Sequence, residues 1–219
     1  MNLAKAFTVP SLLWRLRTTP DQPQDLVDFV FDSKLICPLQ VREELLVLAD
    51  IVGKLRPKVV LEIGTARGGT LCVLSRLADP NATIVSVDLP SGQFGGGYKW
   101  FHIPIFKRFP RRGQKLHLLR GDSHGPEMLR AVREVLGQRT LDLLFIDGDH
   151  SYDGVKQDFE KYMPLVTQGG MVVLHDIAPH VLESCQVARF WNELKTRYKT
   201  QEIIENQQQG WAGIGLVHV

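Results

Sequence analysis

The fold is decided by one segment, VVLEIGTARGGT, which occupies residues 59–70. Its first part is a short apolar run that ends in Gly64, which predicts a buried strand over residues 59–64. A turn with two further glycines follows and leads into a predicted helix over residues 70–78. Glycines in such a turn let the backbone approach a ligand, and the free N–H groups of the helix attract a carboxylate or phosphate. The spacing differs from the dinucleotide pattern G-x-G-x-x-G, and a tight turn without a ligand remains an alternative.

Helical and strand-like patterns alternate on both sides of this segment. An apolar helix pattern precedes it over residues 39–55. Strands are predicted at 83–88, 115–119, 141–147 and 171–175, helices at 127–136, 153–165 and 181–198, and β-like runs at 201–205 and 214–219. Such alternation is typical of a parallel α/β sheet. The sequence therefore predicts a Rossmann-like, doubly wound, three-layer α/β/α fold with a seven-stranded, mostly parallel sheet and an antiparallel edge strand.

Two segments, an N-terminal arm and a long loop, lie outside this alternation. The arm is predicted over residues 1–37, and the main domain over residues 38–219. The arm begins with a short amphipathic helix within residues 1–17, which we expect to dock on the domain or on a second subunit, as in a homodimer. Residues 90–113 form a predicted long loop.

Charge and composition exclude several classes of partner. The chain has 219 residues, 26 basic and 24 acidic side chains and a net charge of +2, which gives no basis for a nucleic-acid or membrane partner. Its three cysteines form neither a disulfide framework nor a metal-ligand spacing, and no signal peptide is recognisable, so we expect a cytoplasmic protein. One local basic run is either a solvated loop or a patch for an anionic or phosphate-bearing substrate. The run consists of Lys107, Arg108, Arg111, Arg112 and Lys115.

Polar residues follow the second and third predicted strands. In doubly wound sheets, ligands bind beyond the carboxyl ends of the strands. Asp88 ends the second strand, where a carboxylate can accept both hydroxyls of a ribose. Asp122 and Ser123 follow the third strand and are placed to meet an adenine edge. Taken alone, Asp88 is equally well explained as a helix cap or turn residue.

Acidic residues and histidines follow the fourth and fifth strands. The fourth ends in Asp147 with His150 close behind, and the fifth ends in His175 and Asp176. Two carboxylates at neighbouring strand ends repel unless a proton or cation intervenes, and Mg²⁺ takes such oxygen ligands. The histidines are candidate nitrogen ligands or bases. The alternative is that these groups bond backbone atoms and cap helices.

Three motifs resemble those of a known family. LEIGTARGGT (61–70), IDGDHSYDGV (146–155) and GGMVVLHDI (169–177), with the FGGGY loop (94–98), resemble the class I S-adenosylmethionine-dependent methyltransferases of methyltransferase family 24. This group contains cephalosporin hydroxylase-like proteins and small-molecule O-methyltransferases. The resemblance covers residues 38–219.

The resemblance implies roles for individual residues. Glu62, Gly64 and Thr65 would line the methionine part of S-adenosylmethionine, Asp88 would lie at the ribose, and Asp122 with Ser123 at the adenine. A divalent metal, Mg²⁺ or another cation, would bind at Asp147 and Asp176 as in catechol-type O-methyltransferases. Those enzymes have a lysine three residues after the first metal aspartate, where this chain has His150. His175 replaces a more usual carboxylate or amide and is the third candidate ligand.

We therefore expect methyl transfer to a hydroxyl of a small molecule. The protein would supply alignment, Asp147 would hold a metal that lowers the hydroxyl pKa, and His150 would take the proton. The 90–113 loop would close over the acceptor through a flexible segment at Gly95–Gly97. Its contact surface would comprise Tyr98, Trp100, Phe101 and Phe106. A dimer contact is the alternative for this loop, and Trp211 would border the pocket or lie in the core.

Two other functions fit the same residues. The first is a hydroxylase-like oxygenase with an iron triad of His150, His175 and Asp176. The second is a non-catalytic partner protein that binds S-adenosylmethionine. A nucleic-acid methyltransferase is disfavoured because the sequence has no Asn-Pro-Pro-Tyr-like motif and no extended basic stripe.

Overall fold

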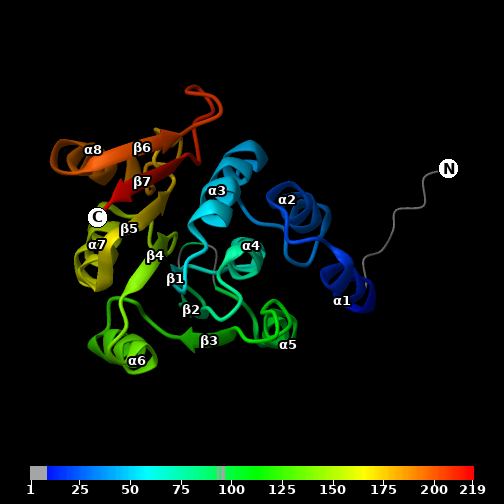
Figure 1. Ribbon diagram of the computed structural model, residues 1–219. Coiled ribbons are helices and arrows are strands. Elements are labelled where there is room, and N and C mark those ends of the chain that lie inside the picture. The colour runs from blue at the N-terminus through cyan, green and yellow to red at the C-terminus, as the bar shows by residue number, and fades with distance from the viewer. Residues whose placement is uncertain (1–8, 93, 95–96) are drawn as a thin grey trace.

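A seven-stranded sheet forms the centre of the molecule (Figure 1). The computed structural model describes residues 9–92, 94 and 97–219. The strands are β1 (Val59–Ile63), β2 (Thr83–Asp88), β3 (Lys115–Arg120), β4 (Leu141–Ile146), β5 (Val166–His175), β6 (Lys199–Ile203) and β7 (Ile214–His218). Their order is β3-β2-β1-β4-β5-β7-β6, with β1 to β5 parallel and β7 antiparallel to both β5 and β6. The predicted doubly wound sheet with antiparallel pairing at one edge is confirmed.

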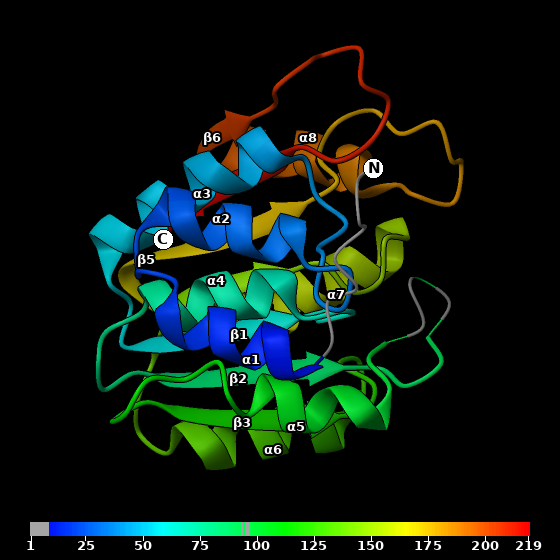
Figure 2. The ribbon, with the colours of Figure 1, turned by 90° about the vertical axis from the view of Figure 1, so that its right-hand side faces the viewer.

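Helices cover both faces of the sheet, which confirms the three-layer prediction (Figure 2). One face carries α1 (Val9–Thr18), α2 (Pro23–Asp32), α3 (Arg42–Leu55), α4 (Gly69–Leu77) and α5 (Ile103–Phe106). The other carries α6 (Pro126–Leu136), α7 (Tyr152–Tyr162) and α8 (Val187–Arg197). Short 3-10 turns precede α5 at Trp100–His102 and follow α7 at Met163–Leu165.

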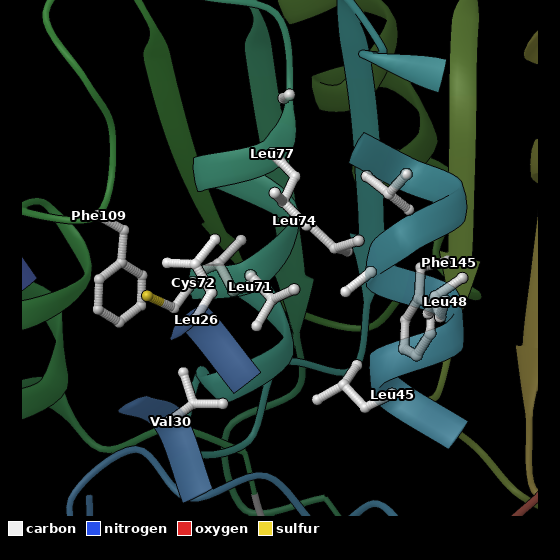
Figure 3. Close-up of a cluster of buried hydrophobic side chains, with 14 of the residues drawn as sticks. Leu26, Val30, Leu45, Leu48, Leu71, Cys72, Leu74, Leu77, Phe109 and Phe145 are labelled. Atoms are coloured by element: carbon white, nitrogen blue, oxygen red, sulfur yellow. The ribbon is translucent and has the colours of Figure 1, made fainter. Parts of the chain in front are cut away.

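Each face of the sheet has its own apolar core. Figure 3 shows part of the first core, in which Leu26 and Val30 of α2 lie near Cys72 of α4 and Phe109. All of these side chains are almost completely buried. Burial of a large apolar side chain contributes roughly 1.5–3 kcal/mol, so α2 is an integral part of this layer.

The N-terminal helix docks on the domain of its own chain. Leu12 and Leu16 of α1 are buried in the first core. The guanidinium of Arg76, at the end of α4, donates to the carbonyl oxygens of Leu16 (2.6 Å) and Thr19 (2.9 Å). The expected amphipathic helix therefore exists at Val9–Thr18, while residues 1–8 of that prediction lie outside the described part of the chain.

Several element boundaries differ from the predicted ones. Helix α2 was not predicted, although Pro23 at its first turn is a common start signal. The helix predicted from residue 181 begins only at Val187, because Val181 and Leu182 are 79% and 59% exposed and do not pack. The predicted loop 90–113 contains α5, whose Phe106 is buried. No helix among the described residues is long and apolar enough to cross a bilayer.

The turns after β1 and β4 are locked together at the carboxyl edge of the sheet. The N–H of Gly64 donates to the Val87 carbonyl (2.9 Å), and the N–H of Asp147 donates to the Ile63 carbonyl (2.8 Å). Gly64 has φ +87°, and a Cβ on it would lie 1.9 Å from the Asp147 carbonyl oxygen. Glycine is therefore required here by the neighbouring backbone, a reason different from the ligand approach inferred from the sequence.

Candidate active site

Two adjoining cavities open at the carboxyl edge of the sheet. The first has a volume of about 310 Å³, and the turns after β1, β2, β3 and β4 all contribute to its wall. The second has a volume of about 490 Å³ and lies towards the turn after β5 and the segment before α3. Both volumes are typical of small-molecule sites. The two cavities share part of their wall, formed by Gly64, Ala66, Phe94 and Asp147.

The structure brings most of the predicted site residues to these cavities. Gly64, Asp88, Asp122, Ser123 and Asp147 line the first. The second is lined by Gly64, Thr65, Asp147, His150, His175 and Asp176, and Trp211 also borders it. Glu62 does not line either cavity, since its side chain is fully buried beneath the turn after β1.

Glu62 supports the glycine turn from below. Its Oε2 accepts a hydrogen bond from the Thr65 hydroxyl (2.8 Å), and that hydroxyl also lies 2.7 Å from the Ser86 hydroxyl. Burial raises the pKa of Glu62 well above its ordinary value, while the Thr65 hydrogen bond opposes this shift. We infer that Glu62 fixes the position of Thr65 instead of contacting a ligand directly.

Asp88 joins two segments of the first cavity. Its Oδ2 accepts from the N–H groups of Ala66 (3.1 Å) and Tyr98 (2.9 Å). Burial raises the pKa of Asp88, and these backbone donors partly offset the shift. The carboxylate therefore bonds backbone groups, as the turn-residue alternative required, and it also forms part of the cavity wall. Its contact with a ribose stays a prediction.

The turn after β3 forms the far end of the first cavity. Asp122 has a 58% exposed side chain, and its Oδ1 accepts from the His124 N–H (2.9 Å). The Ser123 carbonyl accepts from the Tyr162 hydroxyl (2.8 Å), which anchors the turn to α7. Both residues line the first cavity, and their contact with an adenine stays a prediction.

His124, which the sequence reasoning missed, also lines this cavity. Its Nε2 lies 3.2 Å from the Gly154 carbonyl, which can only accept, so this nitrogen carries a proton. The same atom lies 3.4 Å from Oδ1 of Asp158, a fully buried residue of α7. The interaction with Asp158 raises the pKa of His124, although burial opposes it. No motif signals this pair, because its members are 34 positions apart in the chain.

We expect this pair to make stability depend on pH. Because the folded-state pKa of His124 is raised, its stabilising effect is complete below about pH 6, where the unfolded chain is also protonated, and is lost as pH rises through the folded-state pKa. The difference in free energy of unfolding between the wild type and His124→Gln should therefore shrink from about pH 6 to about pH 9. Urea denaturation at both pH values measures it. Asp158→Asn should remove the same pH dependence, and an unchanged dependence in that variant would contradict the assignment.

Four side chains form an ionic cluster on the wall of the second cavity. The Asp147 carboxylate lies 3.1 Å from His175 Nδ1 and 3.5 Å from His150 Nε2. The Asp176 carboxylate lies 2.9 Å from His150 Nδ1 and 3.4 Å from His175 Nδ1. Two imidazoles thus face two carboxylates, and the convergence of Asp147 and Asp176 expected from the sheet topology is present.

The cluster balances its own charge. Burial lowers the pKa of both histidines, but the carboxylates outweigh it and raise the pKa of His150 to about 12 and that of His175 to about 10. Burial raises the pKa values of Asp147 and Asp176, but the histidines reverse this and hold both below the ordinary value. In this arrangement His150 carries a proton between two carboxylates.

Two further residues shape the cluster and were not identified from the sequence. The Gln40 side-chain amide donates to Asp147 Oδ2 (3.1 Å), and Gln40 is 5% exposed. The Phe94 ring stacks on the His150 ring, with centroids 5.0 Å apart and planes 13° apart. Phe94 lies in the FGGGY motif, which was a usable signal, whereas nothing in the sequence around Gln40 marks it.

The aromatic surface predicted for the 90–113 loop is only partly present. Tyr98 and Phe106 are 2% and 0% exposed, so the prediction that they contact the acceptor is wrong. Phe106 instead packs on the glycine turn, where a Cβ on Gly68 would lie 2.3 Å from its ring. Trp100 and Phe101 are 74% and 44% exposed but line neither cavity. Gly95 and Gly96 lie outside the described residues.

The donor atoms of the cluster suit one of the two predicted metal sites. One ligand atom each from Asp147, His175 and Asp176 lie within 4.8 Å of one another, and His175 Nε2 is buried without a hydrogen-bond partner among the described residues. This mixed oxygen and nitrogen set fits a divalent transition ion better than Mg²⁺, which prefers oxygen. The iron triad of His150, His175 and Asp176 does not meet the same distance limit within the described ranges.

Comparisons with known proteins agree on one class of domain. A family model described as a methyltransferase domain matches residues 61–177. The O-methyltransferase TomG from Streptomyces achromogenes, solved in complex with SAM, is 17% identical, with 99% of this chain and 93% of that chain covered and a TM-score of 0.60. An O-methyltransferase from Bacillus cereus, solved with SAH, is 16% identical over 99% of this chain and 94% of that chain, with a TM-score of 0.61.

Curated relatives are larger proteins. The uncharacterized protein y4gI from Sinorhizobium fredii is 27% identical over 153 residues, which is 66% of this chain. The chain spans 16% of the length of the curated relatives it matches.

Proposed function

Since the chain belongs to the methyltransferase domain family, whose model matches more than half of it, we propose that it transfers a methyl group from S-adenosylmethionine to a hydroxyl of a small molecule. One observation carries this proposal. Gly64, Asp88, Asp122 and Asp147 come from four different strand ends and line a single cavity. The solved O-methyltransferases with the same fold, one with SAM and one with SAH, support this choice of cofactor.

The first cavity is the proposed cofactor site. Asp88 would accept the ribose hydroxyls, and Asp122 with Ser123 would meet the adenine. The methionine part would lie along Gly64 and the turn that Thr65 stabilises. When bound, the cofactor supplies a methyl group that its sulfonium has already activated, so the protein's task is mainly alignment.

The second cavity is the proposed acceptor site. It adjoins the first through Gly64, Ala66, Phe94 and Asp147, so an acceptor there would lie next to the cofactor. Its wall contains apolar groups such as Leu39, Leu182 and Trp211, which suit a small organic acceptor. Charge and composition give no reason to prefer a nucleic acid.

Asp147 is the proposed proton acceptor. It is the one member of the ionic cluster that borders both cavities. As the new oxygen–carbon bond formed and the carbon–sulfur bond broke, leaving a neutral thioether, the hydroxyl proton would pass to a carboxylate oxygen of Asp147, which Gln40 and His175 hold in place. His150, our sequence-based candidate for the base, has a carboxylate near each ring nitrogen, Asp176 at 2.9 Å and Asp147 at 3.5 Å. These carboxylates raise the pKa of His150 and favour its protonated form, so in this proposal it would orient Asp147 and Asp176.

A divalent metal is a second part of the proposal. Asp147, His175 and Asp176 would hold it, and it would lower the pKa of the acceptor hydroxyl. Activity without added metal and with chelator, followed by re-addition of Mn²⁺ or Mg²⁺, tests this part. Equal activity under all conditions would remove the metal from the mechanism and leave methyl transfer intact.

Calorimetry tests the cofactor site. S-adenosylmethionine should bind the wild type with a dissociation constant on the order of micromolar, and Asp88→Ala should weaken binding about tenfold or more. The control is Asp79→Ala, because Asp79 lies outside the first cavity. If the wild type showed no heat of binding and no thermal shift with S-adenosylmethionine, the proposed function would be contradicted.

The proposal also covers the cellular location and the oligomeric state of the protein. We propose a cytoplasmic protein, in agreement with three free cysteines. We also propose a homodimer, since the exposed aromatic side chains of Trp14, Trp100 and Phe101 are suited to a subunit contact. Light scattering of the purified protein tests it.

A further inference from the structure

Four of the five residues of the basic run singled out in the sequence, all except Lys115, line a third cavity. This basic hollow has a volume of about 410 Å³ and lies between the end of α1, the end of α4 and residues 107–112. Helix α1 and helix α5, which directly precedes residues 107–112 in the chain, lie side by side (Figures 1 and 2). It shares no lining residue with the two cavities of the candidate active site. Its cationic lining consists of Arg17, Arg76, Lys107, Arg108, Arg111 and Arg112.

The charge of the basic hollow is poorly balanced. Asp21 pairs with Arg76 and Arg111 at its edge. In the described part of the chain, the other four cationic side chains have no carboxylate within ion-pair distance. Like charges brought together around one concavity repel, and the fold supplies too few anions to offset them. The balance favours an anion from outside the chain.

The hollow is also built on a fixed base. Leu16 and Phe109 line it and are 3% and 1% exposed, so they belong to the first core. The Arg76 side chain is 3% exposed, and its hydrogen bonds to the Leu16 and Thr19 carbonyls hold its guanidinium in place. The remaining cations are exposed and can turn towards a ligand. A fixed floor with adjustable arginines is suited to recognition of a multiply charged group.

From this geometry we propose that the basic hollow binds the phosphate or pyrophosphate group of a small soluble molecule. Arginine forks bind phosphate oxygens through two parallel N–H bonds, which a single lysine cannot do. Arg17, Arg108 and Arg112 supply such forks from two separate segments. The apolar floor of Leu13, Leu16 and Pro110 accommodates an organic portion of the ligand. The site is separate from methyl transfer and does not depend on it.

Calorimetry with inorganic pyrophosphate at low ionic strength tests the proposal. The wild type should bind it, and the double variant Arg108→Glu/Arg112→Glu should bind about tenfold more weakly or worse. The matched control is Arg130→Glu/Arg133→Glu, which changes the net charge equally on α6, on the opposite face of the sheet. Its affinity should match that of the wild type. Far-UV circular dichroism spectra of both variants that match the spectrum of the wild type would show that their folds are intact.

The outcomes distinguish a discrete phosphate site from a diffuse charge effect and from adhesion to an anionic membrane. Equal loss of pyrophosphate affinity in both double variants would show a diffuse charge effect and overturn the proposal. No binding by the wild type would overturn it as well. A sedimentation assay with phosphatidylglycerol vesicles is the second arm. Binding to vesicles without binding to pyrophosphate would replace a discrete phosphate site with adhesion to an anionic surface.

Discussion

Gly64→Ala is expected to lower the free energy of unfolding by about 3–5 kcal/mol and to abolish cofactor binding in the protein that remains folded. The added Cβ would lie 1.9 Å from the Asp147 carbonyl oxygen and 2.3 Å from its carbon. The backbone cannot easily retreat, because hydrogen bonds tie Gly64 to Val87 and Asp147 to Ile63. Both turns line the first cavity, so any displacement changes the proposed cofactor site.

A second glycine separates the clash from backbone strain. Gly169 has a similar φ, +82°, but a Cβ there would meet no atom within 4 Å. Gly169→Ala should therefore cost only the strain of the left-handed conformation, about 1–2 kcal/mol. Urea denaturation measures both variants, and calorimetry measures their cofactor affinity. If the two variants were equally stable, the contact between the β1 and β4 turns would not be the reason for glycine at position 64.

Asp147→Asn is expected to reduce methyl transfer by about 10²- to 10⁴-fold while changing cofactor affinity little. The substitution keeps the size of the side chain but removes its charge and its ability to accept the hydroxyl proton. It also leaves His175 and His150 facing a neutral amide in place of a carboxylate. The rate constant at saturating acceptor and the calorimetric affinity for S-adenosylhomocysteine separate chemistry from binding.

Asp149→Asn is the matched control for this prediction. Asp149 lies in the same turn and lines the first cavity, but its carboxylate accepts from the Ser151 N–H, a role that asparagine can keep. Its activity should stay near that of the wild type. Comparable losses in both variants would show that the turn as a whole, and not the Asp147 carboxylate, is sensitive to substitution.

The sequence predicts most of the sheet because its signals are local. The apolar run and glycines of residues 59–70 specify the first strand, turn and helix, and the sheet topology then places Asp88 and Asp147 at one edge. Boundaries are less predictable where apolar residues do not pack. Val181 and Leu182 continue a helical pattern, but they are exposed and lie before α8.

Contacts between distant segments limit how much of the site can be predicted from the sequence. Gln40 reaches Asp147 across 107 positions, and His124 meets Asp158 from another strand end. Neither pair produces a periodicity or a motif. The protonation of His150 was unpredictable for the same reason, because it depends on distances to two carboxylates from different strands. Residue types at the strand ends indicated the chemistry, but the partners of each side chain required the structure.

The stacking of Phe94 on His150 has a consequence for how two substrates would share the protein. The Phe94 ring forms part of the wall of both cavities. If a ligand in one cavity displaces this ring, the shape of the other cavity changes as well. Linkage then requires each occupant to alter the other's dissociation constant by the same factor. Inhibition by a product analogue would consequently vary with acceptor concentration, and replacing the ring with alanine would weaken this dependence, leaving only the contribution of the other shared wall residues.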